Sequence, residues 1–111
     1  MHKALELKFY PGVEGQEKTY VAPTFISGRV FRETVKVEKT LKQRQESKQF
    51  DVEDLDFTAD YVVLVFGKQF TRDEFYDGIS VEDVVTAAQK CIQHIVTKVN
   101  SAASGGATPN A

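Results

Sequence analysis

The sequence predicts an α+β domain that is mainly α-helical, with a short N-terminal β-hairpin packed on three to four helices and a disordered C-terminal tail. Alternating apolar and polar residues near the N-terminus have the period of a half-buried strand. Four later segments each begin with a helix-capping residue next to an apolar one, which is typical of helix starts. Residues 101–111 contain no large apolar side chain. We therefore expect one domain over 1–100, followed by a flexible tail.

The hairpin is predicted over residues 3–22. Leu7 and Phe9 share one face of an extended chain, with charged residues between and beside them. A stretch rich in proline and glycine at 11–15 interrupts this pattern, and 18–22 resumes it. A two-stranded hairpin is only marginally stable in water, so we expect it to pack against the helices.

Four helices are predicted, at about 28–46, 52–67, 72–77 and 81–100. The residues expected to cap their N-termini are Ser27, Asp51, Thr71 and Ser80. Glu74 adds a capping box to the third helix. The second helix is apolar nearly all round at its end, 61–66, and is expected to be central. The polar stretch 39–48 either extends the first helix or forms a loop.

The sequence offers no arrangement typical of catalysis or of cofactor or metal binding. Cys91 falls on the apolar side of the last helix and His94 lies beside it, so a buried thiol and a half-exposed imidazole are the simplest interpretations. The acidic run 51–56 lacks the central glycine of a calcium loop. No glycine-rich phosphate loop is present, because no lysine follows Gly105 and Gly106. We expect a protein that is not an enzyme and needs no cofactor.

Charge and hydropathy give no indication of a nucleic acid or membrane partner. The net charge of −2 argues against a surface built to hold nucleic acid. The basic stretch 36–48 is diluted by Glu38 and Glu46 and is followed at once by acidic residues, so we interpret it as a solvated helix face. No apolar run approaches the length of a membrane span.

Aromatic residues are the feature that points to binding. The chain carries eight phenylalanines and four tyrosines, which is a heavy load for a core of this size. A leftover apolar patch on a small protein is often a binding surface, although each ring could equally belong to the core. We predict a partner-binding surface; the same patch could mediate self-association into a homo-oligomer, and the sequence does not separate the two uses. Its members are Phe31, Phe66, Phe70, Phe75 and Tyr76.

Three segments taken together resemble a known family. APTFISGRVFR at 22–32, DYVVLVFGKQFT at 60–71 and FYDG at 75–78 are similar, in order and spacing, to tail assembly chaperones of long-tailed bacteriophages. The likeness is to the group found in phages and prophages of Gram-positive bacteria, and it runs from about Leu5 to Val99.

The resemblance implies a chaperone of the host cytoplasm that is absent from the mature virion. Such proteins bind and solubilise the tape measure protein, a long, largely helical and apolar chain around which tail tube subunits polymerise. In many phages a frameshifted, longer product recruits the tail tube protein. Two alternatives remain open from the sequence: a small helical DNA-binding regulator that uses the basic side of the first helix, and a structural tail completion or connector protein.

Overall fold

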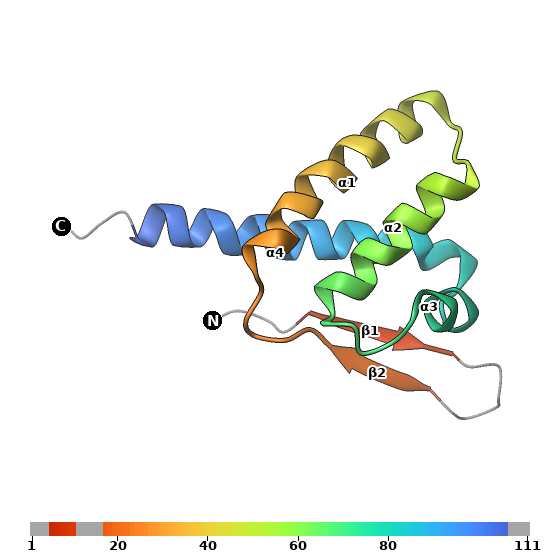
Figure 1. Ribbon diagram of the computed structural model, residues 1–111, viewed down its shortest axis with the longest axis horizontal. Coiled ribbons are helices and arrows are strands. Elements are labelled where there is room, and N and C mark those ends of the chain that lie inside the picture. The colour runs from red at the N-terminus through yellow and green to blue at the C-terminus, as the bar shows by residue number, and fades with distance from the viewer. Residues whose placement is uncertain (1–4, 11–16, 107–111) are drawn as a thin grey trace.

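The computed structural model describes residues 5–10 and 17–106. Two strands come first and helices follow, which confirms the predicted mainly helical α+β architecture. The elements are β1 (Glu6–Phe9), β2 (Lys18–Val21), α1 (Gly28–Ser47), α2 (Val52–Val65), α3 (Arg72–Gly78), a 3₁₀ turn (Val81–Asp83) and α4 (Val84–Gly106). Helix α2 packs against α1, α3 and α4, and the hairpin lies at the end where α2 meets α3 (Figure 1).

The hairpin is antiparallel, with Leu7 opposite Tyr20 and Phe9 opposite Lys18. Leu7 and Phe9 are buried, which is the face that the alternating pattern predicts. The backbone N–H of Tyr10 donates to the carbonyl oxygen of Gly78, so the end of β1 is tied to the end of α3. The parts of the predicted hairpin at 3–4 and 11–16 lie outside the described residues.

Helix α1 begins as predicted and ends at Ser47, so most of the polar stretch 39–48 is helical rather than a loop. Lys48 ends the helix in a left-handed conformation, with φ of 59°. The inward side of the helix consists of four residues spaced at three or four positions, Val30, Thr34, Val37 and Leu41. An ion pair between Arg44 Nε and Asp54 Oδ2, at 2.6 Å, holds the far end of α1 to the start of α2.

The predicted caps are partly confirmed. The Asp51 side chain accepts from the Asp54 N–H, and Thr71 and Glu74 form the reciprocal capping box. Ser27 and Ser80 occupy N-cap positions, but neither side chain accepts a capping hydrogen bond from a backbone N–H of the helix; Ser80 Oγ donates instead to Glu82 Oε1 at 3.0 Å. The backbone of both serines is extended, as an N-cap requires. The sequence pattern therefore predicted these two helix starts correctly, although the side-chain capping bond that usually accounts for the pattern does not form.

Helix α2 is the central element. Its Tyr61 hydroxyl lies 2.7 Å from Thr34 Oγ1, which in turn donates to the Val30 carbonyl oxygen, so a buried polar chain links α2 to α1. Burial raises the pKa of Tyr61, which keeps the phenol protonated as a hydrogen-bond donor. The helix ends two residues earlier than predicted, and Gly67 follows in the left-handed conformation (φ 68°) expected of a helix-ending glycine.

Helix α4 is longer than predicted. The segment expected to be a helix over 81–100 starts with a 3₁₀ turn and then runs as an α-helix to Gly106. The helix therefore ends six residues later than predicted, at Gly106, and 107–111 of the predicted tail lie outside the described residues. Alanine favours helix extension and serine tolerates it, and adding residues to an existing helix is cheap. In Figure 1 this end of α4 extends beyond the other elements. Within the described residues, no helix is long and apolar enough to span a bilayer.

Candidate functional site

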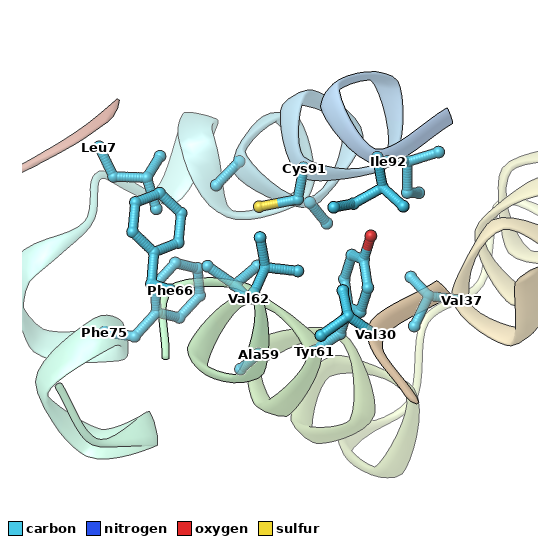
Figure 2. Packing of buried hydrophobic residues seen from close by; sticks show 14 of the residues in the cluster. Leu7, Val30, Val37, Ala59, Tyr61, Val62, Phe66, Phe75, Cys91 and Ile92 are labelled. Atoms are coloured by element: carbon cyan, nitrogen blue, oxygen red, sulfur yellow. The ribbon is translucent and has the colours of Figure 1, made fainter. Parts of the chain in front are cut away.

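Three of the five rings predicted to form a binding surface are in the core. Phe66, Phe70 and Phe75 are each at most 3% exposed, so the expectation that they lie on the surface is wrong. The reason is the hairpin, which closes over the junction of α2 and α3. The Phe70 ring lies 4.7 Å from the rings of both Phe9 and Tyr20, measured between centroids. Figure 2 shows Phe66 and Phe75 packed near Leu7 of β1.

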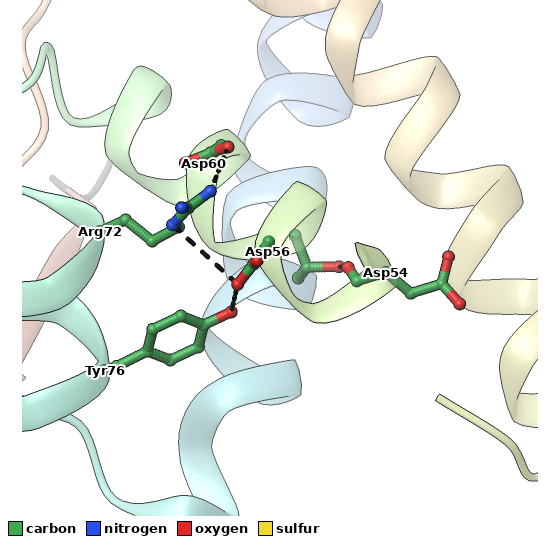
Figure 3. Close-up of polar contacts among 6 residues, drawn as sticks. Asp54, Asp56, Asp60, Arg72 and Tyr76 are labelled. Atoms are coloured by element: carbon green, nitrogen blue, oxygen red, sulfur yellow. Dashed lines mark hydrogen bonds and ion pairs between the residues drawn. The ribbon is translucent and has the colours of Figure 1, made fainter. Parts of the chain in front are cut away.

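Tyr76 is half-buried and holds α3 to α2. Its hydroxyl donates to Asp56 Oδ1 at 2.7 Å, and Arg72 from the same helix reaches Asp60 at 3.1 Å (Figure 3). The Arg72 Nε lies 3.9 Å from Asp56, so that carboxylate is shared between two α3 side chains. Burial, and then the hydrogen bond to Asp56, raises the pKa of Tyr76. This ring therefore has a structural role that its position in the sequence did not reveal.

Phe31 is the predicted ring that stays on the surface. It is 43% exposed, and Val35, one turn further along α1, is 53% exposed. Residues four apart lie on the same side of a helix, so the two form one apolar strip, which we call the Phe31 surface. Phe25, just before α1, is 81% exposed and was not singled out from the sequence. Some aromatic rings are thus exposed, as the composition suggested, but most of the exposed rings are not the ones predicted.

A groove of about 450 Å³ lies between α1 and α2. Its apolar floor consists of the half-buried Phe57, Val63 and Leu64 of α2. The remaining lining residues are Arg29, Glu33, Asp60, Tyr61 and Lys68. Two helices form this groove jointly, so the apolar period of either helix alone could not reveal it.

The groove and the Phe31 surface lie on opposite flanks of α1. Successive residues of an α-helix are about 100° apart, so Phe31 is rotated by roughly 200° from both Arg29 and Glu33, which line the groove. The Lys36 ammonium lies 5.7 Å from the centre of the Phe57 ring, on the groove side. The inward side of α1 lies between these two flanks, so each flank is open to solvent.

In the part of the chain that the structure describes, an apolar strip and a groove reach the surface, and the cysteine is buried. Burial raises the pKa of the Cys91 thiol to about 12, so the thiolate needed for nucleophilic chemistry does not form near neutral pH. Across 5–10 and 17–106, no group of three potential metal ligands comes together. The absence of enzymatic activity stays a prediction.

Comparison with known proteins gives one informative result. No curated protein and no solved structure is significantly similar to this chain. A family described as phage tail chaperone protein, however, matches residues 1–109, which includes all three segments that carry the resemblance and every described element. With nearly its whole length matched, the chain belongs to the family of phage tail chaperone proteins.

Proposed function

We propose that this tail chaperone binds the tape measure protein and keeps it soluble during tail assembly in the host cytoplasm, without entering the mature virion. It also helps to recruit tail tube subunits, which the resemblance attributes to a longer product of the same gene. The observation that carries the proposal is the Phe31 surface, where a phenylalanine and a valine one turn apart remain exposed on α1. A helical, apolar client is suited to a surface of this kind.

The size of the Phe31 surface fits a chaperone that must release its client. Covering the exposed 43% of Phe31 contributes about 1 kcal/mol, scaled from the transfer of a whole side chain. Val35 adds a similar amount when covered. Contacts of this strength hold a client when several act together, and they separate when growing tube subunits compete for the same chain.

The proposal is tested by co-expression with the tape measure protein of the same tail gene cluster. Wild type, Phe31→Ser, Val35→Ser and a control, Gln43→Ser, are compared for the soluble fraction of the tape measure protein and for its co-purification. Gln43 is an exposed residue of the same helix that does not line the groove, and it lies three turns beyond Phe31 and is rotated by roughly 120° from it. We expect the first two variants to lose client while their helical circular dichroism is unchanged.

The control variant should behave as wild type. The proposal is overturned if wild-type protein neither solubilises nor retains the tape measure protein, or if Phe31→Ser retains it fully.

Further measurements separate this function from the alternatives. Mass spectrometry of purified virions should not detect the chain, whereas a completion or connector protein would be present. Binding to duplex DNA should be absent, since DNA binding would appear as an affinity that falls steeply with salt. Sedimentation velocity with wild type and Phe31→Ser tests whether the same surface also joins copies into a homo-oligomer.

A further inference from the structure

The groove between α1 and α2 carries positive charge that the described chain does not neutralise. Of the four charged residues that line it, the two carboxylates are engaged. Glu33 pairs with Arg32 at 2.8 Å and with Lys36 at 3.6 Å, and Asp60 pairs with Arg72. Within the described residues neither Arg29 nor Lys68 makes an ion pair. The groove therefore joins an apolar floor to two uncompensated cations.

Local structure reinforces this positive charge at one end of the groove. Arg29 lies in the first turn of α1, which contains no acidic residue, and a helix N-terminus itself carries partial positive charge. Lys68 follows the end of α2 in a left-handed conformation (φ 61°), with its N–H donating to the Val63 carbonyl oxygen at 2.9 Å. Its backbone is therefore fixed beside the groove. An anion at this end of the groove would meet both cations and the partial positive charge of the helix N-terminus.

We propose that the groove binds an amphipathic helical segment of the client that carries a carboxylate at one end of its apolar face. This inference rests on the proposed function, because it takes the segment to be part of the tape measure protein. From Phe57 to Leu64 the floor is about 10 Å long, which matches two turns of helix and apolar residues at i and i+4. The carboxylate pairs with Arg29 and Lys68.

The composition of the groove favours a peptide over a nucleic acid. A phosphate backbone would place negative charge beside Glu33 and Asp60, which line the same groove, and it would leave the apolar floor without apolar partners. A helix with one acidic end avoids both costs, since its apolar side chains cover the floor and a single carboxylate meets the cations.

The test uses two fluorescein-labelled amphipathic peptides with the same apolar face. One carries two glutamates at one end and the other carries two lysines there. Fluorescence anisotropy should show wild-type protein binding the glutamate peptide about tenfold more tightly, as two partly exposed ion pairs provide. Added salt should reduce this preference. The double variant Arg29→Glu/Lys68→Glu should reverse it.

Control variants keep the result specific to the groove. Lys39→Glu places the same charge change on an exposed part of α1 outside the groove and should leave the preference intact. Leu64→Ser should weaken both peptides to a similar degree, because it changes the floor and not the charges. Circular dichroism of every variant confirms that the fold is retained. The inference is overturned if Arg29→Glu/Lys68→Glu keeps the wild-type preference, or if Lys39→Glu reverses it as well.

Co-expression separates this inference from the proposed function. If wild-type protein captures the tape measure protein and Arg29→Glu/Lys68→Glu captures it equally well, the inference fails and the proposed function stands. If wild-type protein captures no tape measure protein, the proposed function fails, and the peptide preference alone decides whether the groove takes an acidic helix. Should the double variant change self-association in place of peptide binding, the occupant is a second copy and the inference is wrong.

Discussion

Replacing Phe70 by alanine removes the ring that joins the hairpin to the helices. This ring lies 4.7 Å from those of Phe9 and Tyr20 and 5.7 Å from that of Phe66, between centroids. The ring is only 3% exposed, so water that entered the space it leaves would be surrounded by apolar side chains. The substitution leaves a cavity lined by aromatic rings, and it weakens the packing of β1 and β2 against the rest of the core.

The expected cost is large for a chain of this size. Truncating a buried phenylalanine to alanine lowers the free energy of unfolding by about 3–5 kcal/mol. For 111 residues the entropy of unfolding is about 0.23 kcal/mol/K, so a loss of about 4 kcal/mol lowers the melting temperature by about 17 °C. Phe31→Ala, at a ring that is 43% exposed, should cost about 1 kcal/mol and about 4 °C.

The assay pairs these two variants. Urea and thermal unfolding, followed by circular dichroism, give the stability of each, and co-purification with the tape measure protein gives its binding. Phe70→Ala should lose stability, whereas Phe31→Ala should lose client and keep its fold. The reasoning is refuted if Phe70→Ala is within about 1 kcal/mol of wild type while its client binding falls, because that ring would then be a surface contact.

Two further predictions concern buried positions. At Gly78 an added Cβ would lie 3.0 Å from the Phe9 Cβ and ring, so Gly78→Ala should lower the free energy of unfolding by about 1–3 kcal/mol, measured by urea denaturation; an unchanged midpoint would mean that β1 does not pack on α3. Burial raises the pKa of Cys91 from 9.0 to about 12, so between these pH values the folded thiol stays protonated while the unfolded thiol ionises. The stability that is present below pH 9 is therefore lost as the pH rises from 9 towards 12. Between pH 8 and 10 the wild type should lose about 1 kcal/mol more than Cys91→Ala; equal losses would show that the thiol is not sealed in the core.

The arrangement of elements was readable from the sequence because it depends on local signals. The Asp51 cap, the capping box at Thr71 and the glycine after α2 all lie within a few residues of the helix ends that they mark. The end of α4 was misjudged because 101–106 has no apolar stripe, and helix continuation there needs no packing. Sequence patterning detects what a helix buries and not how far it continues.

The binding surface was only partly readable, because exposure is a property of the assembled chain. Phe66, Phe70 and Phe75 cluster in the sequence, but the hairpin, some fifty residues earlier, covers them. Phe31 sits only one position from the buried Val30, and the rotation of α1 alone decides that it faces outward. The shape of the groove depends on which helix lies beside α1, and its charge depends on which side chains pair. Neither property can be predicted before the packing of the helices is known.

The inward side of α1 separates the groove from the Phe31 surface, and this separation bears on how the proposed client would be held. Because Arg29 and Phe31 point in nearly opposite directions from one helix, a segment docked on one flank does not obstruct the other. If both proposed surfaces bind the client, a single copy can bridge two stretches of the same long chain and shorten the distance between them. The number of chaperone copies bound to one client molecule would therefore depend on how many helical stretches that client contains.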